Sequence, residues 1–241
     1  MAAAFPERKN SGGLKRRGRR IIVVAGTDTG VGKTLLTASL LHHCRRRKIA
    51  ARALKPFCSG SRDDVTFLQR LQTGELPDDA VNPYYFSAPI APWLAAREAG
   101  QKVGLEDAME KIKTARKGCD LVILEGAGGV MSPLGEGFNL IDLAAALDAE
   151  MILVGANRLG VINHCLLSLA ALQHAGIQRV KVVLMAQAAV DWSAPMNPWA
   201  IGRLGSASMV LELPFLGESA STAPSVKRNY NKLQKVLARL L

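Results

Sequence analysis

The sequence predicts an α/β fold in which residues 21–241 form a single domain with a doubly wound, mostly parallel sheet. Short apolar, β-branched runs alternate with stretches of helical periodicity, the pattern of strands and helices in a parallel sheet. The first run leads into a glycine-rich turn and a helix start. We find no linker that would divide this part of the chain, so we expect one domain.

The glycine-rich turn reads GTDTGVGKT at positions 26–34. It follows the predicted buried strand 21–25 and precedes the predicted helix 35–41. A strand, a glycine turn and a helix that opens with Gly-Lys-Thr form a phosphate-binding loop, which indicates a phosphate-loop NTPase fold. Five residues rather than the usual four separate Gly26 from Gly32, so the alternative is an ordinary glycine turn. The flanking strand and helix favour the phosphate loop.

The residue types of this loop suit a nucleoside triphosphate. Glycines let backbone N–H groups approach phosphate oxygens, and the helix N-terminus adds a favourable dipole. Lys33 can reach the outer phosphates, and the Thr34 hydroxyl can ligate Mg²⁺. We expect the preceding loop residues to contact ATP as well, namely Thr29, Gly30, Val31 and Gly32.

Further strands and helices follow from the residue pattern along the chain. Strands are predicted at 50–57, 121–124, 151–154 and 180–185. Helices are predicted at 63–71, 105–116, 160–175 and 226–240. Residues 58–61 and 213–217 are predicted loops, and the proline-rich stretch 73–103 a long, packed, irregular connection.

Acidic residues stand at two places where metal chemistry is expected. Glu125 follows the apolar strand 121–124 and precedes a glycine-rich turn, where a phosphate-loop ATPase places a second Mg²⁺-organising group. The alternative for Glu125 is a structural or capping carboxylate. Asp63 and Asp64 open a predicted helix, where aspartate is most often a cap, and their role stays open from pattern alone.

Most of the excess positive charge lies near the N-terminus. The chain has a net charge of +11, and residues 1–20 contribute +6 through seven Lys and Arg against Glu7. Such an arm either contacts nucleic acid or an anionic membrane, or is a disordered, solvated tail. No aromatic residue interleaves with the charges, so we expect a disordered tail and no nucleic-acid or membrane partner.

Cysteine usage and hydropathy indicate the compartment. No apolar run reaches the about 18 residues of a membrane span, and the N-terminus lacks the apolar core of a signal peptide. The cysteines show neither Cys-x-x-Cys pairing nor regular spacing, which argues against a disulfide framework or a zinc site; they are Cys44, Cys58, Cys119 and Cys165. We therefore expect a cytoplasmic protein whose cysteines lie mostly in the core.

Five motifs occur in the order found in one enzyme family. They are GTDTGVGKT at 26–34, KPFCSG at 55–60, NPY at 82–84, EGAGG at 125–129 and GVINH at 160–164. Over about residues 21–220 the chain resembles the dethiobiotin synthetases, whose phosphate loop has the same five-residue gap. The resemblance implies an ATP- and Mg²⁺-dependent cyclo-ligase of biotin biosynthesis. Its substrates would be 7,8-diaminopelargonic acid and CO₂ or bicarbonate, and a carbamate and a carbamic-phosphoric mixed anhydride would precede closure of the ureido ring.

The resemblance also implies a role for particular residues. Lys33 and Lys55 would be catalytic, although Lys55 taken without its motif would rather indicate a surface lysine at a strand end. Mg²⁺ would be organised by Thr34, Asp64 and Glu125, with Gly128 near the nucleotide and Ser59 in contact with the substrate. The family is a homodimer with its active site at the subunit interface. There the substrate carboxylate would meet a helix N-terminus of the neighbouring subunit, formed by Gly160, Val161, Ile162 and Asn163, which pattern alone indicates only as a cap.

The adenine site departs from the family pattern. Gln187 and Ala188 replace an Asn-Asp pair, so an amide remains for the base edge while the acidic partner is absent. The second base-proximal loop is present as Pro214, Phe215 and Leu216. The nucleotide base preference is therefore left open.

Two other classes of function compete with the ligase. A phosphate-loop ATPase of the partitioning or septum-positioning kind would act as a dimeric switch on DNA or a membrane, which the basic arm would suit. Such ATPases usually carry an additional lysine early in the loop, where this chain has Thr27, Asp28 and Thr29. A nucleotide-binding module without catalysis is the third class, and it has no need of both lysines and all the metal-organising residues.

Overall fold

The computed structural model describes residues 20–241 except 73–75 and 190. The basic arm predicted for residues 1–20 lies outside this part except for Arg20, which begins the first strand. Within the described residues the main sheet has six strands in the order β10-β9-β8-β1-β5-β2, and every pair is parallel. Its strands are β1 Arg20–Gly26, β2 Ala51–Leu54, β5 Leu121–Gly129, β8 Glu150–Ala156, β9 Val180–Met185 and β10 Met209–Leu213. The predicted doubly wound α/β fold is confirmed.

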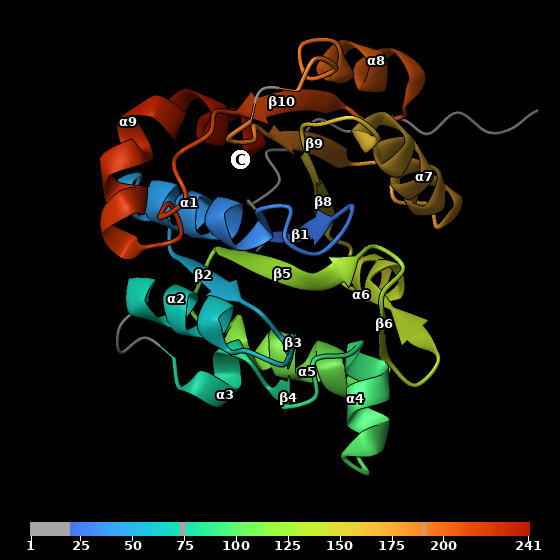
Figure 1. The fold of residues 1–241 in the computed structure, drawn as a ribbon. Helices are drawn as coiled ribbons and strands as arrows, with labels where there is room; N and C mark the ends of the chain where they lie inside the picture. Colours follow the sequence, from blue (N-terminus) through green and yellow to red (C-terminus); the bar gives the residue numbers. More distant parts are fainter. Residues whose placement is uncertain (1–19, 73–75, 190) are drawn as a thin grey trace, which may run out of the picture.

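Helices cover both faces of this sheet (Figure 1). One face is packed by α1 Lys33–Arg46 and α9 Ala223–Leu240, with α2 Asp63–Leu71 beside them. The other face is packed mainly by α5 Leu105–Ala115, α6 Leu140–Ala146 and α7 Val161–His174. The remaining helices are α3 Asp78–Val81, α4 Pro92–Glu98 and α8 Asn197–Leu204.

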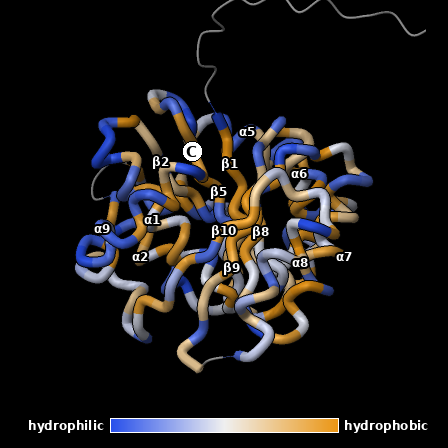
Figure 2. Tube along the Cα trace, turned by 90° about the horizontal axis from the view of Figure 1, so that it is seen from above, coloured by the Kyte–Doolittle hydropathy of each residue, from blue (hydrophilic) through white to orange (hydrophobic). Residues whose placement is uncertain are grey.

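The two faces of the sheet divide the apolar core. Along β1 the side chains of Ile22 and Val24 pack with α1 and α9, whereas Ile21 and Val23 pack on the opposite side. This alternation follows from the two-residue period of a strand. Both sets are almost completely buried because helices lie on each face, which is why β1 reads as a continuous apolar run. Seen from above, hydrophobic residues gather on the central strands (Figure 2).

Two short sheets lie outside the main one and correct the sequence analysis. The predicted strand 50–57 ends at Leu54, and the chain resumes as β3 Phe57–Ser59, part of which was predicted to be a loop. This strand pairs in parallel with β4 Tyr84–Phe86. The stretch 73–103, predicted to be irregular, therefore contains β4 as well as α3 and α4. Its predicted packing is confirmed at Tyr84 and Phe86, which are buried.

Other elements were not predicted at all. These are α6, α8, β10 and the antiparallel pair β6 Pro133–Gly135 and β7 Phe138–Asn139. The glycine-rich turn predicted directly after Glu125 is instead the last part of β5, where Gly129 pairs with Gly26 of β1 beyond a shift in register. Glu125 itself pairs with Val24 of β1, so it is held by a strand rather than by a turn.

Several smaller expectations are settled by burial and contacts. All four cysteines are free and buried, as expected for core residues. No helix in the described part of the chain is long and apolar enough to cross a membrane. The guanidinium of Arg20 donates from Nε to Oε1 of Glu150 at 2.9 Å, which joins the starts of β1 and β8.

Candidate active site

A cavity of about 370 Å³ opens between the phosphate loop, the carboxyl end of β5 and the segment that follows β2. Ligand sites of open α/β sheets lie outside the carboxyl ends of the strands, and this cavity has that position. Its walls combine glycines, hydroxyls and charged groups. They are Thr29, Gly30, Gly32, Lys33, Thr34, Leu35, Lys55, Phe57, Cys58, Ser59, Ser61, Asp64, Glu125, Gly126, Ala127, Gly128 and Ser221.

The phosphate loop has the backbone that its glycines allow. Gly30 and Gly32 have φ angles of 68° and 97°, in the left-handed region that side chains disfavour. Gly32 then caps α1 without a side-chain hydrogen bond, so backbone N–H groups at the helix start remain available to an anion. A Cβ atom on Gly26 would clash with the backbone carbonyl oxygen of Asp28 and lie 2.8 Å from Lys33 Nζ, so the loop has no room for a larger residue there.

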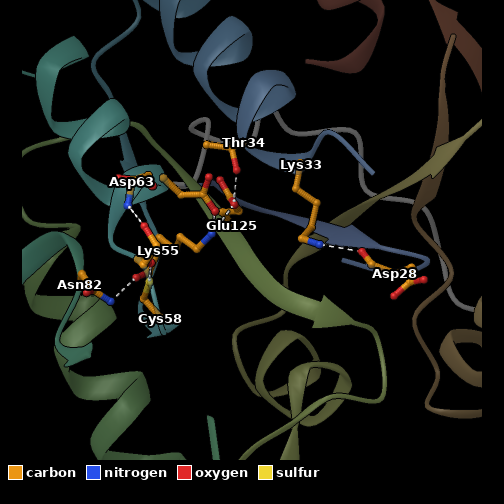
Figure 3. Close-up of polar contacts among 10 residues, drawn as sticks. Asp28, Lys33, Thr34, Lys55, Cys58, Asp63, Asn82 and Glu125 are labelled. Carbon is orange, nitrogen blue, oxygen red and sulfur yellow. Dashed lines mark hydrogen bonds and ion pairs between the residues drawn. The ribbon is translucent and has the colours of Figure 1, made fainter. Parts of the chain in front are cut away.

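Lys33 is curled back over its own loop. Its Nζ donates to the carbonyl oxygen of Asp28 at 2.8 Å, and only 7% of the residue is exposed (Figure 3). Burial lowers the pKa of Lys33, an effect that the nearby charge of Glu125 partly offsets. The ammonium therefore has few protein partners and sits where incoming phosphates would become its strongest ones.

A second lysine lies on the opposite side of Glu125. Figure 3 shows Lys55 and Thr34 both directed at this carboxylate. Glu125 Oε1 accepts from Thr34 Oγ1 at 2.7 Å and from Lys55 Nζ at 2.9 Å. The Lys55 ammonium also donates to Oδ2 of Asp64, so that α1, β5, α2 and the end of β2 meet at one polar network.

Burial and charge act in opposite directions on Lys55. Burial lowers the pKa of its ammonium, but the carboxylates of Glu125 and Asp64 outweigh burial and raise the pKa above its usual value. Lys55 is 7% exposed and Glu125 only 1%, so each charge depends on the other for compensation. A protonated lysine is therefore fixed at the wall of the cavity.

The oxygen atoms of this network fit a hard divalent cation. Thr34, Asp64 and Glu125 offer hydroxyl and carboxylate oxygens, the donor types that Mg²⁺ prefers. Oε2 of Glu125 is buried and has no hydrogen-bond partner among the described residues, so a ligand atom remains unused. The described residues contain no group of three His, Cys, Asp or Glu side chains suited to a metal. A metal here would thus need phosphate oxygens and water as further ligands.

Two further predicted residues lie close to this network. Ser59 is on the cavity wall at the end of β3, and its contact with the substrate stays a prediction. Asp64 is in the first turn of α2, and neither it nor Asp63 forms a side-chain cap for that helix. The alternative that Asp63 or Asp64 caps α2 is therefore wrong.

Asn82 holds the backbone beside Lys55, a role that pattern reasoning did not assign. Its Nδ2 donates to the carbonyl oxygen of Lys55 at 2.9 Å, and the residue is 2% exposed (Figure 3). The signal for it was the Asn-Pro pair, because a proline at 83 disfavours the helical conformation at Asn82, where α3 ends. Ser221, which lines the cavity just before α9, was also missed, and no local pattern distinguishes it from an ordinary loop serine.

The structure leaves other predicted residues away from the cavity. Val31 is buried behind the loop, and the side chain of Gln187 donates from Nε2 to the carbonyl oxygen of Met185 at 2.6 Å. Residues 214–216 form the predicted loop after β10 and do not line the cavity. Gly160 caps α7 with a φ angle of 92°, and none of the residues 160–163 lines the cavity either.

Solved structures show the same fold as this chain. A ParA family ATPase from Chlorobium tepidum matches with a TM-score of 0.59 at 16% identity, covering 93% of this chain and 98% of that one. The cell division protein MinD from Aquifex aeolicus matches with a TM-score of 0.57 at 13% identity, covering 92% and 96%. At such identities the likeness concerns the fold and carries no function.

Sequence comparison is more specific. Residues 20–223 match a family described as an AAA domain. The chain is 34% identical over 224 residues to the ATP-dependent dethiobiotin synthetase of Anaeromyxobacter dehalogenans strain 2CP-C, covering 91% of this chain and 97% of that protein. It is 37% identical over 166 residues to the enzyme of the same name from Bacillus licheniformis, covering 67% and 71%. The chain therefore belongs to the ATP-dependent dethiobiotin synthetase family.

Proposed function

We propose that this protein closes the ureido ring of dethiobiotin from 7,8-diaminopelargonic acid, CO₂ and ATP, as a step of biotin biosynthesis. The observation that carries the proposal is the convergence of two buried lysines, Lys33 and Lys55, on one cavity beside the phosphate loop. The reaction brings together two anions, a carbamate and a triphosphate. A cavity with two fixed ammonium groups and free backbone N–H groups suits that task.

The chemistry proceeds in three steps. One amine of the substrate attacks CO₂ and loses a proton, which yields a carbamate. A carbamate oxygen then attacks the γ-phosphorus of ATP, and ADP leaves. The second amine attacks the carbonyl carbon of the resulting mixed anhydride, and phosphate departs as the ring closes and the amine proton is released.

We assign the two lysines to different anions. Lys33 belongs to the loop that holds the triphosphate, so its ammonium compensates charge on the transferred phosphoryl group. Lys55 stands across Glu125 from the loop and beside Ser59, so its ammonium faces the carbamate. Mg²⁺ held by Thr34, Asp64 and Glu125 would supply further charge compensation for the phosphates. Gly128, with a φ angle of 67°, lets the backbone after Glu125 approach the same ligands.

We further propose a homodimer with a shared active site. The helix start 160–163 is not on the cavity of its own chain, although a helix N-terminus is suited to bind the substrate carboxylate. Exposed apolar side chains lie on α7, on α8 and in the segments before these helices, which supports burial by a second subunit. They are Leu159, Leu167, Trp192, Met196 and Trp199, with exposed fractions between 59% and 98%.

The remaining assignments concern the base and the compartment. We propose that Gln187 and the loop 214–216 border the adenine, since they follow β9 and β10 at the carboxyl edge of the sheet. We place the enzyme in the cytoplasm, where ATP is supplied and where four unpaired thiols would persist. Residues 21–241 are proposed as one ligase domain, and no role is assigned to the arm.

The release of phosphate from ATP in the presence of Mg²⁺ tests the proposal. The full chain is assayed with and without diaminopelargonic acid and bicarbonate, and the product is identified by mass spectrometry. Release that requires both co-substrates, together with formation of dethiobiotin, is the expected result. ATP hydrolysis at the same rate without the co-substrates would indicate a switch ATPase. ATP binding without turnover would indicate a nucleotide-binding module.

A further inference from the structure

Lys55 is bonded to two of the three side chains that we assign to Mg²⁺. Its Nζ donates to Asp64 and, at 2.9 Å, to Oε1 of Glu125. The third side chain, Thr34, donates its hydroxyl to the same Glu125 oxygen at 2.7 Å. One ammonium group therefore stands among the oxygens that a divalent cation would take.

The need for this ammonium follows from burial. Glu125 is 1% exposed, and an uncompensated carboxylate at such a position is strongly unfavourable. Among the described residues, Glu125 forms an ion pair with Lys55. Lys33 adds a more distant attraction but donates to the backbone of Asp28 instead. Lys55 thus supplies the counter-charge of Glu125 whenever no other cation is bound.

The Lys55 ammonium and a bound metal ion cannot both hold the contacts with Glu125 and Asp64. The buried Oε2 of Glu125 has no partner among the described residues, so an entering cation can take it without displacing a donor. Asp64 is different, because one of its oxygens already accepts from Lys55, and its side chain is 46% exposed and able to turn. Asp64 is therefore the group over which the ammonium and the metal compete.

We propose that Lys55 is an internal competitor of the metal. It neutralises Glu125 and Asp64 before the metal binds, and it gives up Asp64 when the metal arrives. The released ammonium then faces the cavity, where the carbamate of the proposed reaction would take the place of Asp64 as its partner. This rests on the proposed function and adds an order to it, with the metal bound before the carbamate is engaged.

Metal binding to the full chain, without nucleotide or substrate, tests the competition. We would titrate Mn²⁺ and follow free Mn²⁺ by electron paramagnetic resonance, for the wild type and for Lys55→Met, which removes the charge and keeps the length. The variant is expected to bind Mn²⁺ about tenfold more tightly or better, because one repelling and competing charge is gone. A folded Lys55→Met protein that binds Mn²⁺ no more tightly than the wild type would overturn the proposal.

Two control variants separate charge from other effects of substitution. Lys55→Arg keeps the competing cation and should bind Mn²⁺ as weakly as the wild type. Lys113→Met removes an exposed lysine at the end of α5, outside the network, and should also leave the affinity unchanged. Tighter binding in Lys113→Met as well would show a general effect of net charge and would count against the proposal.

A measurement on the wild type covers the case in which Lys55→Met does not fold. Labelling of Lys55 by an amine-reactive reagent, quantified by mass spectrometry relative to Lys113, should become faster when Mn²⁺ is added. Unchanged labelling of Lys55 at saturating Mn²⁺ would overturn the release step. Neither measurement uses diaminopelargonic acid, so a failure of ring closure and a failure of this competition are told apart.

Discussion

The two halves of the sheet hold their candidate functional residues in different ways. In the half formed by β1, β5 and β2, Lys33, Lys55 and Glu125 are nearly buried. Lys55 forms an ion pair with Glu125, and Lys33 donates to the backbone of its own loop. In the half formed by β8, β9 and β10, residues 160–163 and 214–216 lie at loops and a helix start beside exposed apolar side chains. The first half is assembled within one chain. The second presents a helix start and exposed apolar side chains, which a ligand or a second subunit could contact.

The largest expected effect lies in the assembled half. Lys55→Ala should lower the turnover number by about 10²–10³-fold, the cost of losing one preorganised group that stabilises transition-state charge. Binding of ATP should persist, because the phosphate loop is untouched. Steady-state phosphate release and calorimetric titration with ATP check the two parts. Ring closure at the normal rate would show that Lys55 is not catalytic.

The features that could be predicted from the sequence are those that depend on residues close together along the chain. Contacts between residues far apart in the sequence could not be predicted. The phosphate loop and the strands 21–25 and 180–185 are encoded in consecutive residues, and the structure places strands at both. The ion pair of Lys55 and Glu125 joins residues 70 positions apart, so no local pattern records it. Only the family resemblance brought those two residues together before the structure was known.

The missed elements also have physical reasons. The α8 sequence NPWAIGRL has a glycine in its interior, which weakens helix propensity, so its helix depends on packing against α7 and β10. β3 and β4 are three residues each, and they are strands because they pair with each other across 27 positions. A run that short cannot be distinguished from a loop without its partner.

The second prediction addresses the half formed by β8, β9 and β10. Leu159→Glu places a charge on an 81% exposed leucine beside the start of α7. If this surface is the proposed subunit interface, the variant should be monomeric. Its kcat/KM for diaminopelargonic acid should fall by about 10–100-fold, the worth of charge-assisted hydrogen bonds to the substrate carboxylate. Sedimentation velocity and steady-state kinetics measure the two effects.

A matched change elsewhere on the surface is the control for that experiment. Leu94→Glu alters a leucine of α4 that is 42% exposed and belongs to the other half of the molecule. It should leave both the oligomeric state and kcat/KM as they are in the wild type. A dimeric, fully active Leu159→Glu protein would remove residues 160–163 from the proposed shared site.

The smallest effect on ATP binding is expected at the proposed adenine site, which belongs to the half formed by β8, β9 and β10. The amide of Gln187 already donates to the carbonyl oxygen of Met185, so its loss in Gln187→Ala should weaken ATP binding by no more than about fivefold, the net worth of one neutral hydrogen bond. Discrimination between ATP and GTP should be weak in the wild type, because the side chain of Ala188 offers no acceptor for the adenine amino group. Ala188→Asp supplies one, and the KM ratio of GTP to ATP should then rise. A high KM ratio of GTP to ATP in the wild type would mean that groups other than Gln187 and Ala188 distinguish the bases. The half formed by β8, β9 and β10 would then already supply a specific base site within one chain.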